Sequence, residues 1–502
     1  MKPLKLQVAK LLADPAVSRS HWGIAVTKMD GTRVYALNAG QFFQPASNAK
    51  LFTTAAAMAL LGPSATVTTK VTAMSSPNKD GVLALGGLRL MGAGDANLSG
   101  RTLPYVPPAL RPNPAPPEAN PLRYLQEMAD QVANTGIKVV EGDIVGNDSL
   151  FPWQPYPEDW SIDDAVWGYG APVSALTVND NEMKVTVTPA ADAGAPATVA
   201  IEQAVPYYTV EPNVATTAAN TMPAVGIDRA LGSKMVRVYG TVPAGMQLMV
   251  SHIAIDDPAA YAAMAFKQML EQRGVRVTGK ARSEHRLSVD TANFVEEAQQ
   301  PLTLPATDSS TQSDCASFCT TLATHVSPSL IDDIVATNKT SQNLHAELIL
   351  RRLGKAFADD GSAAQGARVV RTFLTTLVGI DKDDFVFFDG SGLSGHDLVA
   401  PRATVQLLQY ANTQPWFADW KNSLPVGGVD GTLAGRFTQA SLKGHVFAKT
   451  GTLGEARALS GYIDCASGRT VIFSIMVDNH APHNRADETA MDKIVAAIAE
   501  TN

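Results

Sequence analysis

A helix–glycine–strand unit occurs twice in this chain, at two places far apart. The first copy runs from Pro121 to Gly142 and the second from Pro258 to Gly279. In each copy a proline is placed to begin the helix, a glycine ends it, and a short β-branched run follows. Both copies are predicted to belong to one α/β domain, so the residues between them would be an insertion into that domain.

The residues between the two copies have a different pattern. Polar and apolar side chains alternate with period two in 184–188, 197–201 and 235–240, and helical periodicity is missing. The stretch 183–250 is therefore predicted to form a small β-rich domain nested in the α/β domain.

The two ends of the chain look like parts of one unit. Strand patterns at 22–27 and 33–37 near the start are matched by strand patterns at 458–464 and 470–477 near the end. The predicted fold class is therefore α/β and multidomain. A domain split across both chain ends (1–68 and 300–502) would enclose an α/β domain (69–182 and 251–299) and the nested domain (183–250).

Composition excludes several classes of protein. The 502 residues are 45% hydrophobic and 18% charged, with a net charge of -8 and no long basic run, so a nucleic-acid partner is not expected. No apolar run is long enough to span a bilayer, and no signal-peptide core begins the chain. Either the protein is cytosolic or a signal has been removed.

Cysteine usage predicts neither a disulfide scaffold nor a metal site. Cys315 and Cys319 are close together, and Cys465 stands alone. The first two could form a local bridge or be ordinary thiols. No histidine lies at metal-ligand spacing from them, so no metal and no cofactor are expected.

A serine and a lysine three residues apart could act as a nucleophile and its base. Ser47 and Lys50 stand at the start of a helix predicted from the Ala-, Leu- and Met-rich stretch that ends at Leu61. Residues i and i+3 share a helix face, so the lysine amine can reach the serine hydroxyl and act as its base. Alone, the pair is also what a capped helix with a solvated lysine would contain.

Two further short motifs follow in the chain. Ser341-Gln342-Asn343 precedes a predicted helix, and Lys449-Thr450-Gly451 begins a predicted strand. Each motif is weak by itself. In this order, the three form the Ser-x-x-Lys, Ser-x-Asn and Lys-Thr-Gly set of penicillin-recognising serine acyl enzymes.

Longer stretches around the motifs sharpen the resemblance. Residues 43–54, 168–176, 389–394, 425–433 and 449–462 resemble the D-Ala-D-Ala carboxypeptidase/endopeptidase family, the class C low-molecular-mass penicillin-binding proteins. The resemblance covers almost the whole chain, including the long insertion after the first motif. It implies a penicillin-binding, β-lactamase-like catalytic domain with an antiparallel sheet flanked by helices.

The resemblance also implies a role for each motif. Ser47 is expected to attack the D-Ala-D-Ala carbonyl and Lys50 to take its proton. Ser341 and Lys449 would return a proton to the leaving nitrogen, and Asn343 would hold Lys50 and the substrate amide.

Carboxylate binding and oxyanion stabilisation are assigned to the third motif. Lys449, Thr450 and Thr452, around Gly451, are expected to bind the terminal carboxylate of the substrate. The backbone N–H groups of Ser47 and Thr452 are expected to form the oxyanion hole.

Asp164 is a further substrate-binding candidate. It lies in the stretch 160–169, which resembles the part of the family that carries an aspartate near the substrate. A carboxylate there could bind the free amino group of a diaminopimelate-type side chain. The neighbouring Asp163 could be the equivalent residue instead, and a solvated loop carboxylate is an equal alternative. Trp160 and Tyr169 could line the same site or pack in a domain interface.

Other residues receive structural interpretations. His345 is interpreted as a packed or surface histidine, His480 and His483 as solvated, and Arg351-Arg352 as a solvated charge pair. Residues 389–394 are expected to form a structural turn near the cleft.

The predicted function is a serine DD-peptidase, a carboxypeptidase or an endopeptidase, acting on peptidoglycan stem peptides and acylated by β-lactams. Two alternatives are a β-lactamase and a non-catalytic peptidoglycan-binding scaffold. A β-lactamase would need a deacylating base, and no Glu-x-x-Leu-Asn stretch is evident. The family implies a periplasmic or otherwise extracytoplasmic location, with wall or peripheral membrane association open.

Overall fold

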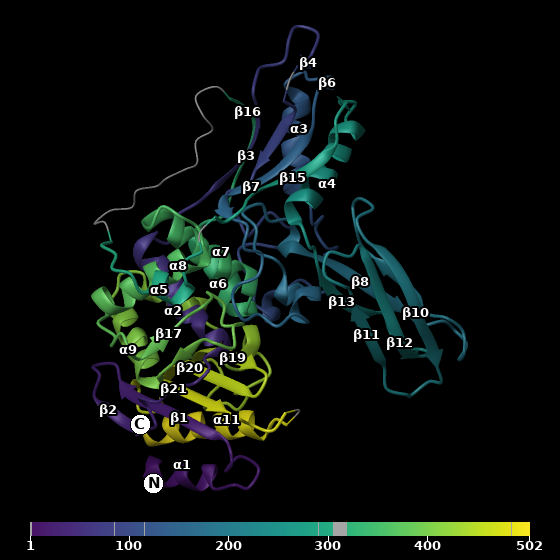
Figure 1. Cartoon of the computed structure of the whole chain (residues 1–502). Coiled ribbons are helices and arrows are strands. Elements are labelled where there is room, and N and C mark those ends of the chain that lie inside the picture. The colour runs from purple at the N-terminus through teal and green to yellow at the C-terminus, as the bar shows by residue number, and fades with distance from the viewer. Residues whose placement is uncertain (1–2, 85, 115, 290, 305–318, 483) are drawn as a thin grey trace.

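The computed structural model of the chain describes residues 3–502 except 85, 115, 290, 305–318 and 483. Cys315 and His483 therefore lie outside the described residues, and so does the possible bridge between Cys315 and Cys319. Figure 1 shows a helix-covered sheet that carries both termini, an upper α/β part, and an arm of strands to one side.

A five-stranded antiparallel sheet joins the two ends of the chain. Its order is β19-β20-β21-β1-β2. The strands are β1 (His21–Lys28), β2 (Arg33–Leu37), β19 (Val446–Leu453), β20 (Ala456–Asp464) and β21 (Thr470–Asp478). β1 pairs with β21 along its length, from His21 opposite Asp478 to Lys28 opposite Val471. The predicted antiparallel sheet built from both chain ends is present.

Helices cover both faces of this sheet, so the side chains on both sides of its strands are buried. Ile24, Phe473 and Ile475 pack in the cluster that holds the two terminal helices. Alternate residues such as Ala25 and Ile472 pack in the cluster on the opposite face. The terminal helices are α1 (Leu4–Leu12) and α11 (Ala486–Thr501). The opposite layer contains α2 (Ala49–Leu60), α6 (Leu330–Thr340), α7 (Asn343–Phe357), α8 (Ala363–Phe373), α9 (Pro401–Asn412) and α10 (Phe417–Ser423), beside α5 (Phe294–Ala298) and the pair β17 (Phe385–Val386) and β18 (Leu398–Val399).

A second five-stranded sheet belongs to the upper part of the molecule. Its order is β15-β7-β5-β3-β16. The strands are β3 (Thr68–Ala73), β5 (Leu88–Met91), β7 (Ile144–Pro152), β15 (Ala281–Arg286) and β16 (Thr320–Val326). β16 pairs antiparallel with β3, from Thr320 opposite Ala73 to Val326 opposite Thr68. This strand therefore lies in the inserted sheet, although its residues fall within the range 300–502 expected for the terminal domain.

The repeated unit is present twice. Its helices are α3 (Arg123–Asn134) and α4 (Pro258–Gln272), and its strands are β6 (Val139–Val140) and β14 (Arg276–Val277). Gly136 and Gly274 follow the helices at φ +84° and +79°, a region that glycine enters at low cost. β14 and β6 lie parallel in one small sheet with β4 (Val82–Leu83). One detail differs: Pro258 is the first residue of α4, whereas Pro121 lies in a turn and α3 begins at Arg123.

The arm in Figure 1 is the predicted β-rich part, and it consists of two three-stranded sheets. Its strands are β8 (Glu182–Thr188), β9 (Thr198–Ile201), β10 (Thr209–Thr217), β11 (Ala224–Asp228), β12 (Met235–Pro243) and β13 (Met249–Ala254). Tyr207 and Tyr208 from this arm belong to the same continuous hydrophobic cluster as Tyr261 of α4. The arm is thus packed on the inserted α/β part.

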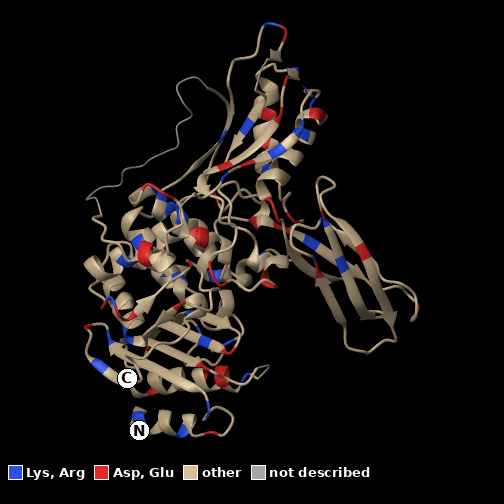
Figure 2. Ribbon diagram, in the orientation of Figure 1, with Lys and Arg blue, Asp and Glu red and all other residues tan. Residues whose placement is uncertain are grey.

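Charge is spread over the molecule. Figure 2 shows Lys and Arg interspersed with Asp and Glu on all parts of the ribbon. Within the described residues, no helix combines the length and apolar character needed to cross a bilayer.

Two interpretations of surface residues were wrong. His480 is 5% exposed, and its Nε2 lies 3.8 Å from Asp487 of α11. Arg351 of α7 is 1% exposed and donates to the side chain and backbone oxygens of Gln154. Both were predicted to be solvated, and long-range packing that no local pattern reports buries them.

Candidate active site

Ser47 lies just before the N-terminus of a buried helix. It lies in the 3₁₀ turn η1 (Ala46–Asn48), and α2 begins two residues later at Ala49. The Lys50 Nζ–Ser47 Oγ distance is 3.0 Å. The i, i+3 contact expected from the first motif is formed, with a short lead-in turn where a continuous helix was predicted.

The second motif occupies the corner between α6 and α7. Ser341 ends α6 in the left-handed conformation, with φ +59° and ψ +39°, and Asn343 begins α7. Lys50 Nζ donates to Asn343 Oδ1 at 2.7 Å. Asn343 Nδ2 donates to the Tyr169 carbonyl at 2.9 Å, which fixes the orientation of the amide.

The third motif lies on the edge strand β19. Lys449 Nζ donates to Ser341 Oγ at 2.8 Å and to the Thr450 carbonyl at 2.9 Å. Asn48 Nδ2 donates to the Lys449 carbonyl at 3.0 Å and ties this strand to the turn that carries Ser47. The structure therefore brings all three motifs together through two lysines.

Gly451 is required by the close approach of β19 to η1. A Cβ at this position would lie 2.6 Å from the Pro45 carbonyl oxygen and 3.1 Å from the Ser47 nitrogen. Any side chain would separate the strand from the serine turn. The remaining threonines are more open: Thr450 Oγ1 lies 2.7 Å from Thr432 Oγ1, and Thr452 is exposed.

The turn 389–394 contributes a group that the motif analysis did not assign. The Asp389 carboxylate accepts hydrogen bonds from the backbone N–H groups of the four residues 391–394. This holds the turn so that the Ser391 carbonyl accepts from Lys50 Nζ at 2.7 Å. Trp160 Nε1 also donates to Asp389 at 2.9 Å, so the inserted part contacts the same turn. The predicted structural turn therefore also holds the lysine.

Burial controls the protonation of both lysines. Burial lowers the pKa of Lys50 to about 8, although the carboxyl groups of Asp389, Glu347 and Asp397 act to raise it. Burial and the neighbouring Lys50 charge lower the pKa of Lys449 well below its usual range. Burial raises the pKa of Glu347 to about 8 and that of Asp397 well above its usual range. Protonation of Glu347 and Asp397 removes their negative charge, and burial outweighs the carboxyl groups that favour a proton on Lys50.

The contacts of Lys50 fit a neutral amine. A neutral amine has two N–H groups and one lone pair. The Asn343 Oδ1 and Ser391 carbonyl oxygens are acceptors only, so they use both N–H groups. The lone pair is then free to accept the Ser47 hydroxyl proton.

Asp164 lies at the side of this site. It is in the 3₁₀ turn η3 (Asp164–Val166), is half-buried, and accepts from the Tyr169 hydroxyl at 2.8 Å. Burial raises its pKa, and the hydrogen bond from Tyr169 acts in the opposite direction. Asp163 is exposed. Because the Tyr169 carbonyl contacts Asn343, the loop that carries Asp164 directly adjoins the second motif.

His345 and its partners were not identified by sequence reasoning. The side chain was interpreted as packed or exposed, and it is fully buried. It bridges two carboxylates, Asp333 and Asp180, which come from distant parts of the chain. No sequence motif marks either aspartate, so sequence reasoning had no signal for this contact.

Within the part of the chain that the structure describes, no group of three or more His, Cys, Asp and Glu side chains is arranged to hold a metal ion. The chemistry available at this site is that of a serine, two buried lysines, an asparagine and backbone dipoles.

Comparison with known proteins gives consistent results. A profile of the D-Ala-D-Ala carboxypeptidase 3 (S13) family matches residues 4–303 and 298–500. A D-alanyl-D-alanine carboxypeptidase from an Actinomadura species is 32% identical over 509 residues, covering 99% of this chain and 84% of that protein.

Solved structures share the fold. Penicillin binding protein 4 from Haemophilus influenzae superposes with a TM-score of 0.78 at 21% identity, covering 97% of this chain and 98% of the other. A predatory endopeptidase from Bdellovibrio bacteriovorus, solved with an immunity protein, has a TM-score of 0.50 at 13% identity and covers 95% of this chain and 92% of its own.

Proposed function

This chain belongs to the D-Ala-D-Ala carboxypeptidase 3 (S13) family and is a serine hydrolase of that class, and from this premise we propose that Ser47 carries the acyl group in the reaction. One observation carries the proposal: Lys50 Nζ lies within hydrogen-bond distance of both Ser47 Oγ and Asn343 Oδ1. The base, the nucleophile and the second motif thus meet at one atom.

Acylation begins with proton transfer. The lone pair of Lys50 takes the Ser47 hydroxyl proton while Oγ attacks the carbonyl carbon of the D-Ala-D-Ala bond. The negative charge that develops on the carbonyl oxygen is stabilised by the backbone N–H groups of Ser47 and Thr452.

Collapse of the tetrahedral intermediate needs a proton on the departing nitrogen. Ser341 Oγ, hydrogen-bonded to Lys449 Nζ, supplies that proton as the C–N bond breaks, and D-Ala leaves with a neutral amine. The proton that Lys50 took from Ser47 passes through Lys449 to Ser341, so both side chains regain their starting state. Water then gives a proton to Lys50 as it attacks the ester carbonyl, and Lys50 returns that proton to Ser47 Oγ as the C–O bond breaks. The net reaction is hydrolysis of one peptide bond.

Substrate orientation requires hydrogen-bond donors for the terminal carboxylate and a group for the donor side chain. Lys449, Thr450 and Thr452 form the carboxylate site beside Gly451 on β19. The pKa of Lys449 is lowered in the free site, and the negative charge of a bound carboxylate favours its ammonium form. Asp164 binds the free amine of a diaminopimelate-type side chain. In this proposal the domain split across the chain ends (1–68 and 300–502) supplies the reaction groups, and the inserted part (69–182 and 251–299) supplies Asp164.

The substrate class follows from the family. Peptidoglycan stem peptides are the substrates, β-lactams acylate the same serine, and the enzyme works in the periplasm or otherwise outside the cytoplasm, where peptidoglycan is. The printed names of the relatives, a carboxypeptidase and a penicillin binding protein, support this assignment.

The proposal is tested by labelling with fluorescent penicillin and by D-Ala release from a stem pentapeptide. We expect the wild-type protein to be labelled on the peptide that contains Ser47, and Ser47→Ala to lose both labelling and D-Ala release. A matched control is Ser149→Ala, which removes a half-buried hydroxyl on β7 that donates to Asn147. Labelling that survives in Ser47→Ala contradicts the acyl-enzyme assignment.

The same assays distinguish the alternative functions. Release of D-Ala from a monomeric pentapeptide indicates a carboxypeptidase, and cleavage of a purified cross-linked dimer indicates an endopeptidase. Rapid penicillin turnover without D-Ala release would indicate a β-lactamase. A protein that gives neither labelling nor product would be a scaffold.

A further inference from the structure

His345 is a fully buried histidine that bridges two buried carboxylates. Its Nδ1 lies 2.6 Å from Asp333 Oδ1, and its Nε2 lies 3.1 Å from Asp180 Oδ1. Asp333 is on α6, His345 is on α7, and Asp180 belongs to the inserted part. One side chain therefore connects three elements within two residues of Asn343.

The corner beside it is conformationally demanding. Ser341 occupies the left-handed region at φ +59°, which costs a non-glycine residue free energy and persists only where surrounding contacts hold it. This conformation presents Ser341 Oγ to Lys449. The contact between His345 and Asp333 joins α6 and α7 on either side of that corner.

Asp180 is itself placed by an unusual turn. It is the middle residue of η5 (Asn179–Asn181), and all three residues have φ between +49° and +54°. Asn and Asp enter this region more readily than other side-chain-bearing residues. The turn directs the Asp180 carboxylate to His345, to Gln342 Nε2 at 3.4 Å, and to Arg101, with which it forms an ion pair.

The charges of this network are complementary. Burial acts to lower the pKa of His345, but Asp333 and Asp180 outweigh it and raise the pKa to about 9. Arg101 and His345 lower the pKa of Asp180 to about 2, against the effect of burial. His345 thus faces the carboxyl groups of Asp333 and Asp180, and Arg101 forms an ion pair with Asp180. Removing one member would leave a buried charge without its partner.

We propose that the buried network of Arg101, Asp180, His345 and Asp333 positions the Ser341–Asn343 corner for catalysis, with His345 as its central positioning residue. The network touches neither substrate nor reacting atoms. Through its contacts with α6 and α7, it keeps Ser341 in contact with Lys449 and Asn343 in contact with Lys50. The inserted part thereby contributes to the geometry of the reaction centre. This inference rests on the proposed function of the three motifs.

The chain contains a matched control for testing this role. His285 lies between Asp148 at 2.9 Å and Asp257 at 3.3 Å, and these carboxylates raise its pKa to about 9 against the effect of burial. It is on β15 of the inserted sheet, and among the described residues its side chain contacts Asp148, Asp257 and Trp153 and none of the three motifs. His345→Gln and His285→Gln therefore break the same kind of contact, one beside the motif and one away from it.

The two variants and the wild type are compared for acylation by fluorescent penicillin, for kcat and KM of D-Ala release from a stem pentapeptide, and for Tm. Because displacement of catalytic groups by about 1 Å costs on the order of 100-fold in rate, we expect His345→Gln to lose about tenfold to 100-fold in acylation rate and kcat. We expect its KM to change little, because the carboxylate site on β19 is intact. His285→Gln should keep its acylation rate and kcat, even with a lowered Tm.

The inference is overturned if acylation by His345→Gln equals that of the wild type, or if both variants lose acylation in proportion to their loss of Tm. If His345→Gln does not fold, Asp180→Asn provides the second test, because it keeps the side-chain shape and removes the charge. Retention of the wild-type acylation rate in a folded Asp180→Asn protein also overturns the inference.

These outcomes are distinct from failure of the proposed function. Absence of Ser47 labelling in the wild-type protein contradicts the acyl-enzyme assignment itself. Normal wild-type labelling, together with identical behaviour of the two histidine variants, contradicts only the positioning role.

Discussion

At the scale of single residues, Lys50 is the group on which the chemistry depends. It is completely buried, and its ammonium form would have to be stabilised by carboxyl groups that are themselves buried. Glu347 and Asp397 respond by keeping their protons, because desolvation of the charged form is the largest effect on the pKa of each carboxyl group. The pocket therefore makes the neutral lysine accessible near pH 8, where an unperturbed lysine stays charged.

The pH dependence of acylation should follow Lys50. Its pKa is lowered to about 8, and only the deprotonated amine can accept the Ser47 proton, so the acylation rate constant should rise as the pH increases through about 8. The measurement is the pseudo-first-order rate of benzylpenicillin acylation between about pH 6 and about pH 9, a range in which an unperturbed lysine stays charged. A flat profile, or a rate that falls over this range, would mean that another group is the base.

At the scale of secondary-structure elements, the site forms where the N-terminus of a helix, the corner between two helices and an edge strand pack together. α2 presents Ser47 and Lys50, the α6–α7 corner presents Ser341 and Asn343, and β19 presents Lys449. Local patterns predicted the helix after Ser47, the helix after Asn343 and the strand at Lys449, whereas α6 was not predicted. The contacts between these elements were not predicted either, because helix and strand propensities carry no information about contacts between residues hundreds of positions apart.

Gly451 is where two of these elements touch most closely. We expect Gly451→Ala to push β19 away from η1, since the new Cβ would lie 2.6 Å from the Pro45 carbonyl oxygen. Overpacking of this kind costs about 1–3 kcal/mol in stability, and the shift of Lys449 should slow acylation by more than about tenfold. Thermal unfolding and fluorescent-penicillin labelling measure the two effects.

Gly435→Ala is the matched control, because a Cβ at that position meets no atom within 4 Å. It should leave both the Tm and acylation close to wild type. If the two alanine variants behave alike, the close approach at Gly451 is not what holds the strand on the serine turn.

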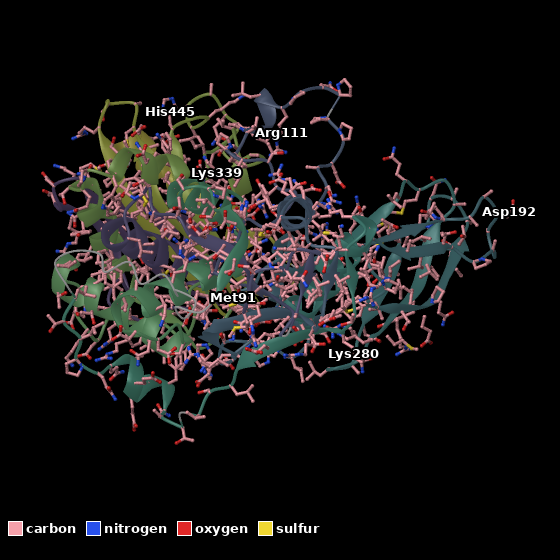
Figure 3. The ribbon with its side chains drawn as sticks, turned by 90° about the horizontal axis from the view of Figure 1, so that it is seen from above. Met91, Arg111, Asp192, Lys280, Lys339 and His445 are labelled. Carbon is pink, nitrogen blue, oxygen red and sulfur yellow. The ribbon has the colours of Figure 1, made fainter. Side chains whose placement is uncertain are left out.

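At the scale of the whole molecule, the inserted parts adjoin the reaction centre. The Tyr169 carbonyl contacts Asn343, and Trp160 contacts Asp389. The β-rich arm supports the same loop, because Arg229 donates to the Ala165 carbonyl at 3.2 Å. In Figure 3, Asp192 marks the far end of that arm, well away from Lys339 and His445 in the part that carries the motifs.

Asp164 is where this arrangement should affect substrate choice. We expect Asp164→Asn to raise the KM for a pentapeptide with a free side-chain amine by about tenfold or more, because a hydrogen bond to a charged group contributes about 1.5–3 kcal/mol. Acylation by benzylpenicillin, which lacks that amine, should change little. Steady-state kinetics with the peptide, and with a version whose side-chain amine is acetylated, measure the difference.

The adjacent Asp163→Asn provides the control, since Asp163 is exposed and carries the same charge. Its KM should match that of the wild type. An increased KM in Asp163→Asn with an unchanged KM in Asp164→Asn would transfer the role to the neighbouring residue.

The amino-acid sequence by itself determined the local parts of this protein. The i, i+3 spacing of Ser47 and Lys50, the alternation in the terminal strands and the helix–glycine–strand repeat all depend on neighbours along the chain, so they can be read directly from it. The order of three short motifs indicated a penicillin-recognising serine acyl enzyme, and the longer stretches around them indicated the family.

Tertiary structure alone decided the protonation of Lys50, the contact from the Ser391 carbonyl and the burial of His345 between two carboxylates. It also paired β16 with the inserted sheet and buried Arg351 and His480. Each of these depends on desolvation and on charges contributed by residues far away in the chain. The same serine and lysine would be an ordinary capped helix start if the α6–α7 corner and β19 were not packed against them.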